Sequence, residues 1–210
     1  MAQFFSLHPT HPQPRLIRQA AEIVRGGGLI AYPTDSCYAL GCHLGDREAM
    51  ERLRRVRGVD DKHHLTLMCR DLSEISGHAL VDNVQYRLLK HATPGSYTFI
   101  LRATKEVPRR LMHPRRKTIG VRVPEHVVAH ALLEELGEPL LSATLQLPGD
   151  EAPLADAELI RARLEHQLDL ILEAGACGTE PTTVIDLTGD LPEVLRVGRG
   201  PLAPLGLEAG

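Results

Sequence analysis

Short apolar segments of strand length alternate with amphipathic segments of helix length, and this alternation constrains the fold of the chain most. Residues 15–25 carry apolar side chains at helical spacing, and glycines at 26–28 end the helix that they predict. Further helices are predicted after the capping residues Asp46, Asp82 or Asn83, and Asp156, and from Pro124 to Gly137. Strands are predicted at residues 29–32, 65–69, 97–101, 118–123, 140–144, 168–172, 183–187 and 194–197. Strands that alternate with helices predict a single-domain α/β fold with a twisted, mixed and mostly antiparallel sheet and flanking helices.

The composition narrows the class of protein. The 210 residues suffice for one sizeable core, and a net charge of −3 gives no overall basic field that would attract nucleic acid. Three phenylalanines, four tyrosines and no tryptophan argue against RNA binding on an aromatic platform. The N-terminus lacks the pattern of a signal peptide, and no run of about 18 apolar residues predicts a membrane span. We therefore expect a cytoplasmic protein with no membrane partner.

Polar residues follow the first predicted strand directly. Thr34 and Asp35 come immediately after the apolar run at 29–32, at the kind of strand end where ligands bind in open α/β sheets. The same residues also suit a structural turn in which Asp35 accepts hydrogen bonds from nearby backbone amides. Both interpretations stay open at this segment.

One later strand carries a second polar face. Thr118, Gly120 and Arg122 alternate with apolar residues and therefore point to one side of the sheet, where the glycine leaves room for a ligand. The alternative is a half-exposed strand with a solvated arginine. The hydroxyls and arginines at the predicted strand ends would together line a cationic hollow suited to a carboxylate and a triphosphate. They are Thr34, Thr98, Thr118, Ser142, Thr182, Arg122 and Arg196.

Neither a phosphate loop nor a metal site is predicted. The glycines at 26–28 precede a strand, whereas a dinucleotide fingerprint follows one. His126 and His130 are spaced as in a zinc helix, but the glutamate of such a motif is replaced by Val127. We expect no protein-bound transition metal, and we expect the other histidines, including the pair at 63–64, to be surface or packing residues.

A basic stretch lies between two predicted strands. Residues 105–117 contain Arg109, Arg110, Arg115 and Arg116, which are candidates for RNA binding. A solvated loop is the alternative, since charge runs often have no partner.

Five motifs, in this order, resemble the YrdC-like family of L-threonylcarbamoyladenylate synthases over residues 15–200. They are Pro33-Thr34-Asp35-Ser36-x-Tyr38-x-Leu40-Gly41, Pro94-Gly95-x-x-Thr98, Gly120-Val121-Arg122-x-Pro124, Thr182-Thr183-Val184-Ile185-Asp186 and Arg196-x-Gly198. The segments 3–5, 66–71 and 105–110 are similar to the YciO branch of that family. The resemblance implies a YrdC-like domain at 15–200 around a large cationic cavity, with an N-terminal extension at 1–14 and a C-terminal tail at 201–210.

The resemblance also implies an activity. The family joins L-threonine, bicarbonate and ATP, normally with Mg²⁺, into threonylcarbamoyl-AMP and pyrophosphate, and this product serves the threonylcarbamoyladenosine modification of tRNA. Carried over to this sequence, the threonine-binding residues are Thr34, Arg122 and Thr182. The nucleotide-binding residues are Thr98, Thr118, Ser142 and Arg196.

Two family motifs are altered in this chain. A Lys-x-Arg motif reads Arg57-Gly58-Val59, a Ser-x-Asn motif reads Ser142-Ala143-Thr144, and a histidine on the threonine side is Met68. We expect Arg57, Ser142 and Thr144 to be the catalytic residues of a weak or divergent synthase, because a lost phosphate contact slows the reaction. The alternative is a non-catalytic protein that binds tRNA or double-stranded RNA.

Overall fold

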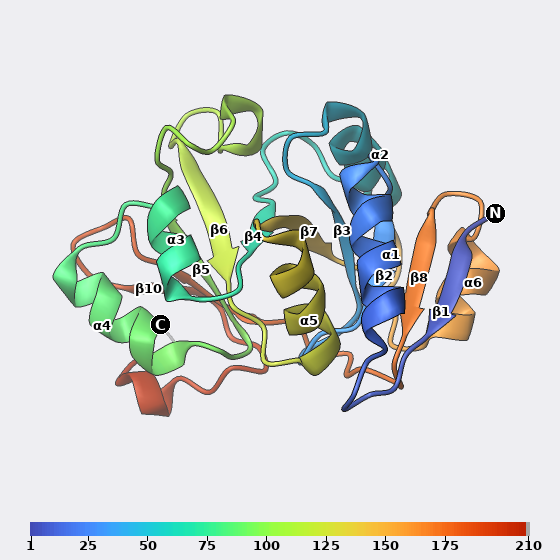
Figure 1. The fold of residues 1–210 in the computed structure, drawn as a ribbon. Coiled ribbons are helices and arrows are strands. Elements are labelled where there is room, and N and C mark those ends of the chain that lie inside the picture. The colour runs from blue at the N-terminus through green and yellow to red at the C-terminus, as the bar shows by residue number, and fades with distance from the viewer. Residues whose placement is uncertain (209–210) are drawn as a thin grey trace.

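A ten-stranded mixed sheet runs through the whole protein (Figure 1). The computed structural model describes residues 1–208. The strands are β1 (Gln3–Ser6), β2 (Ile30–Tyr32), β3 (Ala39–His43), β4 (Thr66–Met68), β5 (Tyr97–Arg102), β6 (Thr118–Arg122), β7 (Leu140–Thr144), β8 (Leu170–Glu173), β9 (Thr183–Asp186) and β10 (Glu193–Arg196). The α-helices are α1 (Pro14–Arg25), α2 (Arg47–Arg57), α3 (Leu72–His78), α4 (Asn83–Ala92), α5 (Val127–Leu136) and α6 (Ala157–Leu164). Two 3₁₀ helices, η1 (Arg109–Leu111) and η2 (Ala203–Leu205), complete the elements.

The strand order is β1-β8-β2-β3-β7-β4-β6-β5-β9-β10. The pairs β1–β8, β2–β8, β4–β6 and β5–β9 are parallel, and the other neighbours are antiparallel. This topology confirms the predicted mixed α/β sheet. It also brings segments that are distant in the sequence side by side, because β4, from the first third of the chain, lies between β6 and β7.

The two faces of the sheet carry different cores. On one face, α1 and α5 pack against apolar side chains such as Tyr32, Met68 and Leu140 (Figure 1). On the other face, a larger core joins the sheet to α2, α3, α4 and α6. Side chains alternate between the faces along each strand, so β2, β3, β4, β7 and β8 contribute residues to both cores, whereas β5, β6 and β9 contribute only to the larger one.

Part of the α1/α5 face is not covered by these two helices. Register pairs Thr66 of β4 with Gly120 of β6 and with Ser142 of β7, while Met68, two residues on, pairs with Leu140. Residues two apart on a strand share a face, so polar positions continue the same surface on which α5 packs. This polar continuation is where the cavity described below lies.

Several elements differ from the prediction. Strands β1 and β3 and helix α3 were not predicted, since β1 is a short edge strand and β3 contains Gly41 and no β-branched residue. Helix α5 begins at Val127 rather than at Pro124, because His126 is its N-cap. Helix α6 begins after Asp156 as predicted but already ends at Leu164.

Both ends of the described chain contact the sheet. Residues 3–6 pair with β8 as an edge strand, and the Tyr97 hydroxyl donates a 2.7 Å hydrogen bond to the carbonyl of Pro201. Leu205 and Leu207 pack against the larger core, and residues 209–210 of the expected tail lie outside the described residues. The expected boundaries of the extension, domain and tail stay a prediction. Within residues 1–208, no helix has the length and apolar character needed to cross a lipid bilayer.

Candidate functional site

A cavity of about 310 Å³ opens over the polar part of the sheet face. This volume lies at the lower end of the range typical of ligand pockets, about 300–1,000 Å³. Strands β4, β5, β6, β7, β9 and β10 and the loop after α2 supply its walls. The lining residues include Arg57, Lys62, His63, His64, Thr66, Thr98, Gly120, Thr144, Gln146, Thr182 and Arg196.

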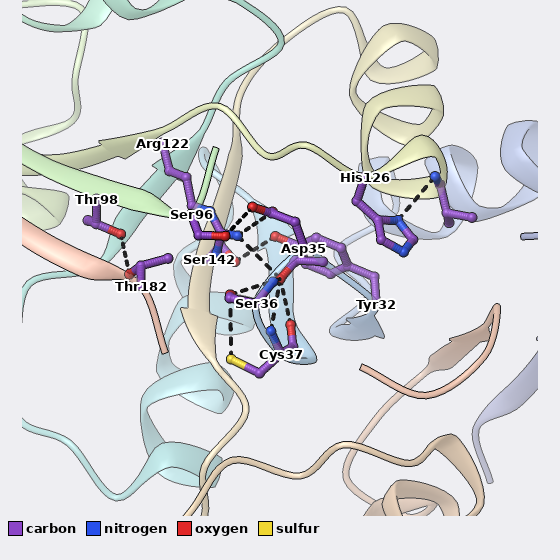
Figure 2. Close-up of polar contacts among 12 residues, drawn as sticks. Tyr32, Asp35, Ser36, Cys37, Ser96, Thr98, Arg122, His126, Ser142 and Thr182 are labelled. Carbon is purple, nitrogen blue, oxygen red and sulfur yellow. Dashed lines mark hydrogen bonds and ion pairs between the residues drawn. The ribbon is translucent and has the colours of Figure 1, made fainter. Parts of the chain in front are cut away.

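Five of the predicted site residues line this cavity: Arg57, Thr98, Thr144, Thr182 and Arg196. The hydroxyls of Thr98 and Thr182 are 2.8 Å apart, although 84 residues separate them in the sequence (Figure 2). The Arg196 guanidinium donates two hydrogen bonds, of 2.8 and 3.0 Å, to the carbonyl of Thr182. Strand β5, the residue before β9 and the end of β10 thus hold two hydroxyls and one cation together.

Arg57 reaches the cavity from the C-terminus of α2. Gly58 follows it in the left-handed conformation (φ 64°), which turns the chain away from the helix axis. The Arg57 guanidinium donates a hydrogen bond to the carbonyl of Gln146, and its buried Nε has no partner among the described residues. Burial lowers the pKa of this guanidinium from its ordinary value, as expected for a cation held partly out of water.

Thr34, Asp35 and Arg122 form a buried cluster that does not line the cavity. The Arg122 Nη2 lies 2.5 Å from Asp35 Oδ1 and 3.4 Å from the Thr34 hydroxyl, and the Ser96 hydroxyl donates a 2.6 Å bond to Asp35 Oδ2 (Figure 2). The Arg122 side chain is 6% exposed and that of Asp35 11%. Asp35 therefore has a structural role, since it binds the buried guanidinium of Arg122. This role is compatible with a ligand site, because the same arginine was predicted to bind a ligand.

The electrostatics of this cluster are dominated by the ion pair. Burial by itself would raise the pKa of Asp35, but the Arg122 guanidinium and the Ser96 hydroxyl outweigh burial and hold that pKa below its ordinary value. Asp35 is therefore ionised at neutral pH. The Nε of Arg122 is buried and has no partner among residues 1–208, so this N–H donor is available.

Two other predicted residues have protein partners and lie outside the cavity lining. Ser142 is 1% exposed, its hydroxyl donates to the carbonyl of Leu40 at 2.8 Å, and it is 2.7 Å from the Tyr32 hydroxyl (Figure 2). Thr118 is 2% exposed and lies 3.0 Å from His64 Nε2. Contact of these two hydroxyls with a nucleotide stays a prediction. Such a contact requires each hydroxyl to leave its present partner in the protein and bind the nucleotide instead.

Part of the cavity wall was not predicted from the sequence. Lys62, His63 and His64 line the cavity, whereas we expected the two histidines to be surface or packing residues. They belong to the loop that starts at the left-handed residue Gly58 and ends at β4. The one signal in the sequence was their place between the altered Lys-x-Arg motif and a buried strand.

The basic stretch forms an exposed loop between β5 and β6. Arg109, Arg110, Arg115 and Arg116 are all exposed, while Val107 and Leu111 are buried in the larger core and fix the loop. Arg110 donates to the carbonyl of Gly45, and Arg116 forms a 3.4 Å ion pair with Asp186. RNA binding by these arginines stays a prediction.

The histidines of α5 do not form a zinc pair. His126 accepts a 3.2 Å hydrogen bond from the backbone amide of Val128 as an N-cap, and burial lowers its pKa (Figure 2). His130 lies 3.8 Å from Glu134 on the exposed helix surface. No group of three or more metal-ligating side chains comes together among the described residues.

A second, larger hollow lies away from this cavity. It has a volume of about 850 Å³ and runs between the N-terminus of α5, the C-terminus of α4 and the start of α3. Its lining includes Tyr86, Pro94, Val123 and Val127 and contains none of the predicted site residues. Most of the surface that lines this groove is apolar, although Arg70, Lys90 and His130 also border it. It contains none of the hydroxyl and arginine pairs that distinguish the smaller cavity.

Comparison with known proteins places this geometry in a family. The sequence model of the Sua5, YciO and YrdC proteins, described as "Telomere recombination", matches residues 22–198. The chain belongs to the Sua5/YciO/YrdC family. The family assignment confirms the resemblance on which the site residues were chosen.

The chain is highly similar in both sequence and structure to a protein that is described as uncharacterized. It is 60% identical to YciO of Escherichia coli (strain K12) over 204 residues, which are 97% of this chain and 99% of that protein. The crystal structure of E. coli YciO superposes with a TM-score of 0.95 and covers 98% of this chain and 100% of that chain. The single-domain α/β fold is therefore shared over the whole of YciO.

Relatives with a stated activity are more distant. The chain is 33% identical to the threonylcarbamoyl-AMP synthase of Chromobacterium violaceum over 181 residues, which are 85% of this chain and 92% of the synthase. The crystal structure of P. abyssi Sua5 complexed with L-threonine has a TM-score of 0.85 at 27% identity. That match covers 93% of this chain but only 57% of the Sua5 chain.

Proposed function

We propose that this protein binds ATP and L-threonine and forms threonylcarbamoyl-AMP from them and bicarbonate, with Mg²⁺, more slowly than relatives with intact motifs. One observation carries the proposal: five residues predicted for this reaction line a single cavity, although they come from distant segments of the chain. The threonine complex of P. abyssi Sua5 supports threonine as a ligand of the shared fold.

The cationic side of the cavity suits the phosphates of ATP. Arg57 and Arg196 supply guanidinium groups, and Lys62 adds an ammonium at the exposed mouth. Fixed cations in a partly buried site stabilise the negative charge that develops on a pyrophosphate leaving group. Mg²⁺ would enter on the phosphates of ATP, because it binds mainly to substrate phosphates and water, and it would neutralise part of the same charge.

The buried cluster behind the cavity suits the threonine carboxylate. Arg122 has a free Nε donor in addition to its bond with Asp35, and its face of β6 continues through Gly120 to the cavity floor. A substrate carboxylate at this guanidinium would share it with Asp35. We therefore infer that Asp35 positions Arg122 rather than taking part in the chemistry.

The altered motifs account for the slower reaction. Val59 removes one guanidinium from the loop after α2, and Thr144 replaces an amide side chain on the cavity wall. Arg57 keeps a charge, but its planar fork differs from the compact ammonium of lysine. Losing one transition-state contact costs about 10²–10³ in rate in well-studied sites.

Pyrophosphate release dependent on threonine and bicarbonate tests the proposal. We expect slow release by the wild type and faster release by the triple variant Arg57→Lys, Val59→Arg, Thr144→Asn, mainly through kcat. The variant Arg55→Lys, at an exposed position on α2, is the matched control and should behave like the wild type. If neither the wild type nor the triple variant releases pyrophosphate in response to threonine, the protein is not a synthase of this kind.

RNA binding is a second candidate because the basic loop leaves Arg109 and Arg115 exposed. We expect any RNA affinity to fall steeply with salt and to drop in the double variant Arg109→Ala, Arg115→Ala. Competition with ATP locates the binding surface, since RNA on this loop should stay bound when ATP occupies the cavity. A salt-insensitive affinity, or one unchanged in the double variant, would contradict binding by this loop.

A further inference from the structure

The loop after α2 brings two histidines to the cavity wall beside the position where the family's second guanidinium is missing. Val59 is followed within five residues by Lys62, His63 and His64, and all three line the cavity with Arg57. His64 is partly buried, whereas His63 and Lys62 are exposed at the mouth. Lys62, His63 and His64 therefore add hydrogen-bond donors to the cavity wall, and none of them belongs to the altered Lys-x-Arg motif.

His64 is fixed by contacts on two sides. Its Nε2 lies 3.0 Å from the hydroxyl of Thr118, and its ring stacks on that of His113 with 5.0 Å between centroids. His113 Nδ1 accepts hydrogen bonds from the backbone amides of Arg115 and Arg116, at 3.3 and 3.2 Å. The basic loop thus supports the imidazole from behind while His64 lines the cavity.

The charges around His64 disfavour its protonated form in the empty site. Burial lowers the pKa of His64, and His113, His63 and Arg116 lower it further, against the opposite effect of Asp186. The His64 imidazole is therefore neutral at pH 7.

His63 is subject to the same kind of influence. Although His63 is exposed, its ring is partly removed from water, and this lowers its pKa. Arg57, Arg54 and Arg196 lower that pKa further, and Asp60 acts in the opposite direction. A negative charge in the cavity would therefore act against these effects and favour the protonated form of both imidazoles.

We propose that His63 and His64 bind the phosphate chain of a nucleotide in this cavity and take up protons as they do so. A phosphate chain carries several negative charges, and an anion beside an imidazole favours its protonated form. Each protonated ring gains a second N–H donor and a positive charge, which replaces the charge missing at Val59. This inference rests on the proposed ATP binding and adds the residues and the proton linkage.

Proton uptake on binding predicts how the affinity for the nucleotide changes with pH. The bound state holds more protons than the free state, so affinity rises as the pH falls toward the ordinary pKa of histidine, about 6.5. Uptake of one proton corresponds to about a tenfold gain in affinity per pH unit. A phosphate chain bound only by arginine and lysine would show no protein-linked uptake in this range.

Isothermal titration calorimetry of ATP in two buffers with different ionisation enthalpies measures the number of protons taken up. The double variant His63→Gln, His64→Gln keeps amide donors but cannot titrate, and His91→Gln, at an exposed position on α4, is the matched control. The single variant His63→Gln, at an exposed position, is a second test should the double variant fail to fold. Subtracting the double variant from the wild type removes protons that bind to ATP itself. Inorganic pyrophosphate, as a second titrant, tests whether the phosphates alone suffice.

We expect the wild type and His91→Gln to take up more protons than the double variant and to gain affinity as the pH falls. Equal uptake by the wild type and a folded histidine variant that binds ATP would overturn this inference and leave the proposed function intact. Failure of the wild type to bind ATP would overturn both.

Discussion

The sheet face under α5 and its continuation at the cavity are built on adjacent positions of the same strands, yet one is a packed core and the other a site. In the packed half, a Cβ on Gly41 would lie 2.6 Å from Leu140 Cδ2 and 2.9 Å from Tyr32 Cε1. In the open half, a Cβ on Gly120 would lie 3.0 Å from the Thr66 hydroxyl and 3.4 Å from Thr98 Cγ2. Both glycines are needed for space, but only the second leaves that space to a ligand.

The difference follows from helix coverage and from side-chain polarity. Met68 and Leu140 bury apolar surface against α1 and α5, which stabilises the packed half by about 25 cal/mol for each Å² removed from water. Two residues away, Thr66 faces Gly120, and hydroxyl and cationic side chains such as Thr98, Thr182 and Arg57 interrupt the apolar surface that a helix could cover. The site therefore lies where the strand positions on this continuous sheet face change from apolar to polar residues.

The largest effect is expected at the buried ion pair close to the boundary of the two halves, where Arg122 pairs in register with Met68. Arg122→Ala should destabilise the protein by about 3–5 kcal/mol, because it leaves Asp35 charged, buried and without its cation. Urea unfolding measures this loss. The double variant Asp35→Ala, Arg122→Ala should lose less than the single variant, and equal or greater loss would show that the pair is not the cause.

Filling the open half should abolish ligand binding. ATP at 100 times its Kd should stabilise the wild type by about 2.7 kcal/mol through mass action, seen as a higher Tm. Gly120→Val should lose this shift, because its side chain occupies the cavity floor beside Thr66 and Thr98. Gly41→Ala is the matched control and should keep the shift. An unchanged shift in Gly120→Val would place the nucleotide elsewhere.

In the packed half, an added side chain should reduce the stability of the protein and leave ligand binding unchanged. Gly41→Ala should cost about 1–3 kcal/mol of stability, since its Cβ overlaps Leu140 and Tyr32. Gly120→Ala should cost less, because its Cβ would approach no atom closer than 3.0 Å, although the Leu65 carbonyl oxygen at 3.2 Å is backbone and cannot move aside. Chemical denaturation of both variants compares the two halves directly. A greater loss in Gly120→Ala would reverse the distinction between core and site.

The smallest effect should be a pH dependence from Asp35. Its pKa is lower in the folded protein than the ordinary value of 3.8, so the pair contributes stability above that value and loses it as the pH falls through the folded pKa. Urea unfolding at pH 5 and about pH 3 should therefore show a smaller loss for Asp35→Asn than for the wild type. If the wild type and Asp35→Asn lose the same stability between these pH values, other carboxylates cause the loss.

Much of the site could be predicted from the sequence because strand ends carry its residues. Thr98 and Thr182 meet because β5 and β9 are parallel neighbours, and hydroxyls at such ends converge. Ser142 could not be placed in this way, since its burial depends on the Tyr32 hydroxyl, which the pairing of β2, β3 and β7 brings beside it. That pairing involves β3, a strand that the sequence analysis did not predict.

The histidines of the cavity wall were missed for a different reason. His63 and His64 lie in a loop without periodicity, and one left-handed residue, Gly58, decides where the loop goes. The family resemblance offered no help there, because it was drawn from motifs elsewhere in the chain. The path of a loop depends on the backbone conformation of its residues. Amino-acid composition and the spacing of motifs give little information about that conformation.

A crystal structure of the protein with ATP, Mg²⁺ and L-threonine tests most directly that the open half of this sheet face is the site. We predict phosphate oxygens at about 3 Å from the guanidinium groups of Arg57 or Arg196, with the ligand over Gly120 and beside Thr98 and Thr182. Nucleotide bound in the apolar groove between α4 and α5, with this cavity empty at saturating ligand, would contradict the account.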